Sequence, residues 1–199
     1  MANLKMLVYD GITIVYALIA IAIFVPWVLL SLNRYDPNFL FISDTIYRFF
    51  SFFCHQLPSR SLFLDDIKMP VCARCASIYV ATALGLIFFR LKVYGEREFR
   101  MNWPLFVLLF IPTALDGFTQ LFGWRESTNL LRLVTGFPYG LGYAYGIAWA
   151  LPLIYTLLEL IRVCLKGDTK GVKGVVKRLI AMVWPPILKI AFLAKALED

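Results

Sequence analysis

One stretch near the start of the sequence limits what this chain can fold into. From Gly11 to Leu32 no side chain carries a charge, and this run of about 22 residues is long enough for a helix to cross a hydrocarbon core of about 30 Å. The run is too long for the apolar part of a secretory signal, and it ends around Pro26-Trp27 instead of at a small-residue cleavage site. We therefore expect a retained membrane-spanning helix.

The composition points to the same class of protein. Hydrophobic residues make up 60% of the 199 residues, whereas a soluble domain contains about 45–50%. Only a protein that is solvated by lipid can carry so much apolar surface. The formal net charge of +7 would suit a nucleic-acid partner, but the basic residues lie in loops between apolar runs, as they do in membrane proteins. We expect no nucleic-acid binding.

Three more apolar segments are long enough to span a membrane, at residues 71–91, 103–122 and 136–161. With residues 11–32 they predict an all-α fold, a polytopic membrane helix bundle with four transmembrane spans. No linker, repeat or low-complexity tract interrupts the chain, so residues 1–199 are expected to form one integral membrane domain.

Two weaker segments are predicted to be interfacial helices. Residues 45–55 are dense in aromatic side chains but too short to span. Residues 175–197 have apolar positions at helical spacing, yet Pro185-Pro186 and two lysines interrupt them. A fifth span at the C-terminus is the alternative for that segment.

The distribution of basic residues predicts the orientation. If residues 103–122 and 136–161 form a hairpin, eleven basic residues fall on one face of the membrane and seven on the other. An excess of lysine and arginine marks the cytoplasmic face. We therefore expect a multi-pass protein of the cell membrane with both termini in the cytoplasm and residues 54–75 on the extracytoplasmic side.

The fourth predicted span is rich in glycine. Gly136 and Gly140, and again Gly142 and Gly146, have the Gly-x-x-x-Gly spacing that lets helices approach closely. Such faces could support a homo-oligomer.

Residues 54–75 hold three of the four cysteines and the only histidine. A tetrahedral zinc site needs thiolate and imidazole donors. The predicted metal ligands are Cys54, His55, Cys72 and Cys75. We expect Cys72 and Cys75 on the first turn of the helix over 71–91, where the helix N-terminus lowers thiol pKa values.

The cysteine pattern leaves alternatives open. Cys54 and His55 are adjacent, and neighbouring side chains rarely both face one ion, so water or an acid such as Asp116 is the other option for a fourth ligand. The same thiols could instead be redox-active or form a structural disulfide. Cys164 is predicted at the opposite membrane face, too far away to take part.

A second polar set lies at the end of the third span and in the linker after it. A carboxylate inside a span is costly and usually faces a partner or a cavity, so Asp116 marks a candidate site, with Arg132 or Arg74 as its counter-charge. Asp116 and Glu126 are the candidate catalytic residues. The residues expected to bind a substrate headgroup are Gln120, Arg125, Ser127, Asn129 and Arg132. The alternative is an ion-pair network that only locks the second to fourth spans together.

Four motifs carry a resemblance to a known family. They are Cys-His-Gln at 54–56, Cys-Ala-Arg-Cys at 72–75, Asp-Gly-x-Thr-Gln at 116–120 and Arg-Glu-Ser-Thr-Asn-x-x-Arg-x-x-Thr-Gly at 125–136. In this order they resemble a family of small multi-pass membrane proteins of archaea and bacteria that is known as a domain of unknown function. The resemblance covers residues 45–145 and implies a polytopic membrane protein without an established activity. Residues 116–140 are faintly similar to VanZ-like membrane proteins, in which an Asp often stands near the place of Asn129.

Three functions fit these patterns. The first is a zinc-dependent hydrolase or transferase that acts on a membrane lipid or lipid-linked substrate at the outer leaflet. The second is a quinone-coupled thiol-disulfide oxidoreductase, because four spans with an outer Cys-x-x-Cys resemble the plan of the DsbB and vitamin K epoxide reductase families. Those families use a second outer cysteine pair, of which only Cys54 is present here. The third is a non-catalytic accessory membrane subunit.

Overall fold

The computed structural model of the chain describes residues 2–95 and 101–183. Four helical segments in this part are long and apolar enough to cross a membrane, namely Leu4–Leu32, Ala73–Arg90, Trp103–Leu121 and Asn129–Leu165. The predicted all-α membrane fold with four spans is therefore confirmed. The first segment consists of two helices, α1 (Ala2–Ala22) and α2 (Val25–Leu32), with Pro26 in the first turn of the second.

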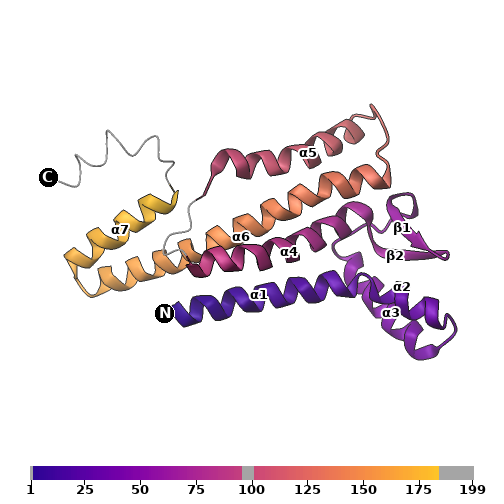
Figure 1. Cartoon of the computed structure of the whole chain (residues 1–199), viewed down its shortest axis with the longest axis horizontal. Helices are drawn as coiled ribbons and strands as arrows, with labels where there is room; N and C mark the ends of the chain where they lie inside the picture. Colours follow the sequence, from indigo (N-terminus) through magenta and orange to yellow (C-terminus); the bar gives the residue numbers. More distant parts are fainter. Residues whose placement is uncertain (1, 96–100, 184–199) are drawn as a thin grey trace.

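The four long helices lie side by side in a row (Figure 1). The order across the row is α5 (Trp103–Leu121), α6 (Asn129–Leu165), α4 (Ala73–Gly95) and α1, and α6 packs against both α5 and α4. Along the chain these four helices alternate in direction, so that the neighbours α4 and α6 run parallel. As a result the start of α4, the end of α5 and the start of α6 meet at the end of the molecule away from the N-terminus.

Small residues let α4 and α6 pack closely. A Cβ added at Gly136 would lie 2.9 Å from the carbonyl oxygen of Arg74, and one at Gly140 would lie 2.5 Å from that of Ile78. The Thr82 hydroxyl donates across this contact to the Gly140 carbonyl, 3.2 Å away. The first Gly-x-x-x-Gly pair is thus used inside one chain, as close helix packing in membranes requires.

The second pair has a similar role. Gly142 and Gly146 face Phe110 and Phe106 of α5. Both glycine faces are therefore covered within the chain. The homo-oligomer stays a prediction, but these faces no longer support it.

A short β-hairpin precedes α4 and was not expected from the sequence. A 3₁₀ turn (Pro58–Arg60) leads into β1 (Ser61–Leu64), which pairs antiparallel with β2 (Ile67–Cys72). The two turn residues, Asp65 and Asp66, have φ values of 46° and 64°, the left-handed conformation of a two-residue hairpin loop. Helix α4 begins only at Ala73, so the predicted span over 71–91 starts too early, and Cys72 ends a strand instead of lying on the first helical turn.

The other predicted boundaries shift as well. The helix predicted over 45–55 is α3 (Pro37–Ser51), which begins earlier because the Asp36 carboxylate caps it by accepting from the Asn38 N–H at 2.8 Å. The span predicted over 136–161 extends over the whole of α6, since neither Pro138 nor Pro152 ends the helix. Of the segment predicted over 175–197, the structure describes the end of α7 (Thr169–Val183), and residues 184–197 lie outside the described part.

Candidate functional site

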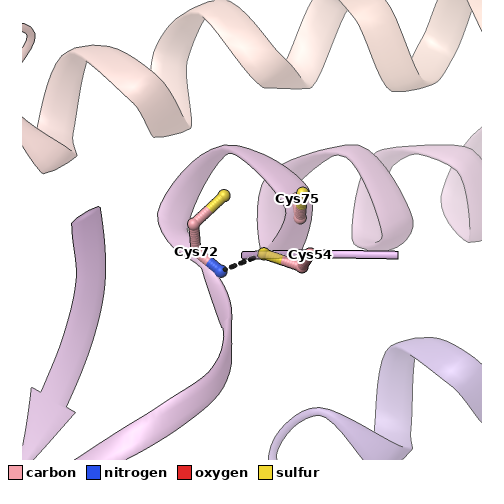
Figure 2. Close-up of side chains that lie close together, drawn as sticks. All are labelled: Cys54, Cys72 and Cys75. Carbon is pink, nitrogen blue, oxygen red and sulfur yellow. Dashed lines mark hydrogen bonds between the residues drawn. The ribbon is translucent and has the colours of Figure 1, made fainter. Parts of the chain in front are cut away.

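Three cysteine side chains converge where α4 begins (Figure 2). Cys54 follows α3 in the loop, Cys72 ends β2, and Cys75 lies in the first turn of α4. Their sulfur atoms all lie within 4.8 Å of one another. The backbone N–H of Cys72 donates to Cys54 Sγ over 3.2 Å. The structure thus gathers three of the four predicted metal ligands from three separate elements.

This geometry suits a zinc ion. Zinc with Zn–S bonds of about 2.3 Å places tetrahedral sulfur ligands about 3.8 Å apart, so the cysteines would need only small side-chain rotations. His55 is exposed, and the structure does not place it in this group. Cys164 is exposed near the end of α6, at the far end of the molecule. Three sulfurs therefore leave a fourth coordination position open.

Hydrogen bonds among the thiols shift their pKa values in opposite directions. Those from Cys72 and Cys75 hold the pKa of Cys54 well below its ordinary value of 9.0. The pKa of Cys72 is raised, chiefly because its proton is shared with the Cys54 sulfur. The lowered pKa of Cys54 favours its thiolate form, which is the form that binds a metal.

The loop that carries Cys54 is fixed by Gln56, which has a left-handed φ of 51°. Its side-chain amide donates to the Tyr47 carbonyl at 2.7 Å, and its own carbonyl accepts from Lys68 Nζ at 2.8 Å. The Tyr47 hydroxyl closes the ring by donating to the Lys68 carbonyl. Gln56 was not among the predicted site residues, although its place in the Cys-His-Gln motif was a signal that could have identified it.

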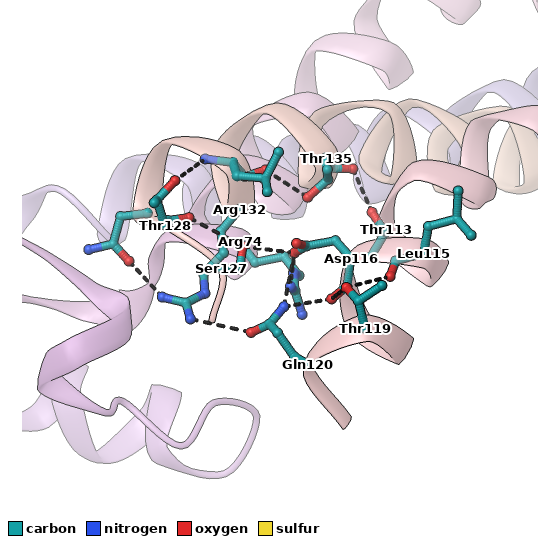
Figure 3. A network of polar contacts seen from close by, with 12 residues as sticks. Arg74, Thr113, Leu115, Asp116, Thr119, Gln120, Ser127, Thr128, Arg132 and Thr135 are labelled. Carbon is teal, nitrogen blue, oxygen red and sulfur yellow. Dashed lines mark hydrogen bonds and ion pairs between the residues drawn. The ribbon is translucent and has the colours of Figure 1, made fainter. Parts of the chain in front are cut away.

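Asp116, which is only 1% exposed, is the centre of a polar network that joins α4, α5 and the linker after α5 (Figure 3). Its Oδ1 accepts from Arg125 Nη2 at 2.8 Å, and its Oδ2 accepts from Arg74 Nη2. Ser127 Oγ and Gln120 Nε2 also donate to Oδ2, each at 3.1 Å. Two cations and two neutral donors therefore share one buried carboxylate.

Arg132 is buried in a different way. Its side chain is 6% exposed, yet in the described part of the chain no carboxylate lies within ion-pair distance of it. It donates to Asn129 Oδ1 at 2.9 Å and, over longer distances of 3.3 and 3.4 Å, to Gln120 Oε1 and the Ser59 carbonyl. A buried guanidinium held only by neutral oxygens is unusual, because burying a charge is costly unless an opposite charge is near.

Arg132 lines a polar cavity of about 340 Å³. The other lining residues come from the 3₁₀ turn, the end of α5 and the linker, and they are Ser59, Arg60, Gln120, Gly123, Arg125, Glu126 and Ser127. Five of the predicted site residues, including Glu126, therefore line one cavity. Glu126 is exposed at its rim. Asn129 lies outside the lining and supports it, since it accepts from Arg132 and donates to the Ser61 carbonyl at 3.0 Å.

Arg60 and Ser59 were not predicted for this site. Both belong to the 3₁₀ turn between Cys54 and Cys72, and no sequence pattern indicates that this turn folds over the start of α6. Of the two predicted counter-charges for Asp116, Arg74 pairs with it and Arg132 does not.

A second, mainly apolar cavity has a volume of about 390 Å³. Phe50 and Tyr79 line it and also belong to the apolar cluster that surrounds Cys54, Cys72 and Cys75. Three further tyrosines contribute to its wall, Tyr16, Tyr139 and Tyr143. The cavity is thus aromatic with several hydroxyl groups.

Comparison with known proteins places both sites in a shared region. Residues 54–146, which include the three cysteines, Asp116 and Arg132, match the family described as "Predicted membrane protein (DUF2085)". An uncharacterized protein of Methanocaldococcus jannaschii is 41% identical over 119 residues, which cover 59% of this chain and 74% of that protein. An uncharacterized protein of Methanothermobacter thermautotrophicus is 41% identical over 96 residues, covering 48% of this chain and 84% of that protein. No solved structure matches the chain.

Proposed function

The chain belongs to the DUF2085 family of membrane proteins, and we propose that it holds the anionic headgroup of a lipid or lipid-linked substrate in its arginine-lined pocket. In this proposal the pocket faces the extracytoplasmic side, a zinc ion on the cysteines braces it, and the reaction is hydrolysis or transfer at the headgroup.

The observation that carries the proposal is the state of Arg132. Its guanidinium is buried, lines the cavity and has only neutral partners among the described residues. A bound anion would supply the missing charge-assisted hydrogen bonds, which are shorter and about twice as strong as neutral ones. The guanidinium is therefore already desolvated and held in position before the ligand arrives, which favours binding.

The cysteine cluster supports the pocket from behind. A metal on Cys54, Cys72 and Cys75 would tie the loop after α3 to the start of α4. That loop leads to Arg60, and the residue next to Cys75 is Arg74, which holds Asp116. We therefore assign the zinc a bracing role, in line with the all-thiolate ligand sets of structural zinc sites.

The two predicted catalytic carboxylates differ in what they could do. Both oxygens of Asp116 are engaged by arginines, so this carboxylate holds the arginines in place and is poorly suited to accept a proton. Glu126 is exposed at the cavity rim and has no ion-pair partner among the described residues. Glu126 is therefore the better candidate for a general base that activates water.

Lipid retention tests the proposal. The protein would be placed in nanodiscs of phosphatidylcholine with a minor fraction of phosphatidylglycerol, and native mass spectrometry would count the lipids that stay bound. We expect wild type to retain the anionic lipid and Arg132→Gln to lose it. Arg48→Gln removes the same charge from exposed α3 and should retain the lipid. Equal retention by all three proteins would refute the proposal.

The aromatic cavity favours a second candidate function. Tyr79 lies one helical turn after Cys75, so a quinone ring in this cavity would stack among aromatic side chains beside three thiols. Two thiols would then be oxidised to a disulfide while the quinone is reduced to a quinol with two protons. Metal content and free-thiol titration separate the two candidate functions. About one zinc per chain with no disulfide would exclude the quinone-coupled oxidoreductase. A disulfide without zinc would exclude the bracing metal.

A further inference from the structure

We propose that the pocket selects a terminal phosphate group, a phosphomonoester with two negative charges, over a singly charged phosphodiester or a zwitterionic headgroup. This inference rests on the proposed function and narrows its substrate class. It draws on the charges, the free donors and the helix end that surround the cavity.

The balance of charge around the cavity favours a dianion. Three arginines and one glutamate line it, namely Arg60, Arg125, Arg132 and Glu126. Behind the wall, the charge of Asp116 is matched by that of Arg74. Two positive charges are therefore left over, which equals the charge of a phosphomonoester above its second pKa of about 6.

The hydrogen-bond donors around the cavity also suit a terminal phosphate. The side chain of Arg60 has no hydrogen bond or ion pair within the residues the structure describes, and it is exposed. Arg125 uses Nη2 on Asp116 and Nε on Thr119 Oγ1, which leaves its other amino group available. Arg132 is held by two bonds longer than 3.2 Å, which a charged acceptor would readily replace. A terminal phosphate offers three acceptor oxygens to these three guanidinium groups, whereas a phosphodiester offers two.

The start of α6 adds to the same preference. Arg132 lies in the first turn of this helix, which Thr128 caps by accepting from the Leu131 N–H at 3.2 Å. Ser127 and Arg132, which flank this helix end, both line the cavity, so the positive end of the helix dipole lies near it, and such ends favour phosphate groups.

The experiment compares lipids that differ in headgroup charge. Nanodiscs would contain phosphatidylcholine with equal minor fractions of phosphatidic acid, a phosphomonoester, and phosphatidylglycerol, a phosphodiester, and native mass spectrometry would count each lipid retained. At pH 7.5 we expect phosphatidic acid to be retained about tenfold over phosphatidylglycerol, which corresponds to about 1.4 kcal/mol. At pH 5 phosphatidic acid carries about one charge, so the ratio should fall to about one. Inorganic phosphate should displace phosphatidic acid at pH 7.5.

Matched variants connect the preference to the pocket. Arg60 is exposed, so Arg60→Gln should fold normally and remove the preference for phosphatidic acid, while Arg48→Gln should keep it. If Arg132→Gln does not fold, Arg60→Gln still decides the matter.

The possible outcomes separate the two proposals. Equal retention of both anionic lipids, lost in Arg60→Gln, would overturn the dianion inference and support the proposed function. Retention of neither lipid over phosphatidylcholine, together with no binding of inorganic phosphate at pH 7.5, would overturn both. Binding of inorganic phosphate at pH 7.5 by wild type but not by Arg60→Gln, in a protein that retains no phosphatidic acid, would support the dianion and overturn the lipid as its source.

Discussion

The cysteine cluster and the arginine pocket lie at the same end of the molecule but are built in opposite ways. The cysteines are packed in an apolar cluster with Phe50, Met69 and Val71, and their sulfurs face one another around room for one small ion. The pocket is polar, has an exposed rim and carries more positive charge than its own carboxylates balance. A thiol cluster packed in an apolar core can stabilise a fold, whereas a polar pocket with an exposed rim can select a ligand.

The two sites are joined through the start of α4. Arg74 and Cys75 are neighbours in the chain, and one reaches Asp116 while the other joins the thiols. A substitution in one site is therefore expected to affect the other, and zinc content and lipid retention can be measured in the same variant.

The largest effect is expected from Asp116→Asn. This change leaves Arg74 and Arg125 without their anion, and removing one partner of a buried ion pair costs about 3–5 kcal/mol. Arg125 is 43% exposed, so we expect a loss of stability near the lower value. Unfolding in detergent measures it, with Glu159→Gln as the control because its pair with Arg178 is exposed and contributes less than about 1 kcal/mol. Similar losses in the two variants would show that the pocket does not depend on its carboxylate.

Cys72→Ser should have the next largest effect. It removes one of three sulfurs, so we expect bound zinc to fall from about one per chain to none, measured by elemental analysis of the purified protein. In the proposed function a zinc ion braces the loop that leads to Arg60, so lipid retention should weaken without disappearing. Cys164→Ser changes an exposed thiol far from the cluster and should leave the zinc in place. Full zinc content in Cys72→Ser would show that the cysteine cluster is not the zinc site.

Gly140→Ala tests the helix contact on which both sites stand. The added methyl group would lie 2.5 Å from the Ile78 carbonyl oxygen, and such overpacking costs about 1–3 kcal/mol. Gly146→Ala makes the same chemical change where the nearest atom, from the Phe106 ring, is 3.3 Å away. Thermal unfolding should rank Gly140→Ala clearly below wild type and Gly146→Ala close to it. The reverse order would contradict the packing of α4 against α6.

The smallest effect is expected from His55→Ala. The His55 side chain is exposed and lies outside the group of sulfurs, so zinc content and stability should stay within error of wild type. A loss of zinc in this variant would instead identify His55 as the fourth ligand.

Much of the frame could be predicted from the sequence. Long uncharged runs leave few options other than spanning helices, and alternating directions bring Cys54, Asp116 and Arg132 to one end. Composition predicts the spans, and the alternation of the spans predicts the end of the molecule at which each loop lies. The sequence therefore predicts that the two polar sets lie close together.

The details of the site depended on contacts that composition does not encode. Three arginines compete for Asp116, and only packing decides that Arg74 and Arg125 reach it while Arg132 does not. The β-hairpin escaped prediction because its turn is Asp65-Asp66 without the usual glycine, and strand pairing depends on partners elsewhere. That hairpin moves Cys72 off the helix and brings Arg60 over α6.

The position of α5 at the edge of the row gives the ion pair at Asp116 a mechanical meaning. In the part of the chain that the structure describes, the extensive contacts of α5 are with α6 alone, and the bond from Arg74 ties its far end to α4. Helix α5 is thus held along one face by α6 and at one end by an ion pair to α4. Arg125, which lines the pocket, shares the Asp116 carboxylate with Arg74, so a ligand that draws Arg125 away would leave Arg74 as the one arginine on that carboxylate among the described residues.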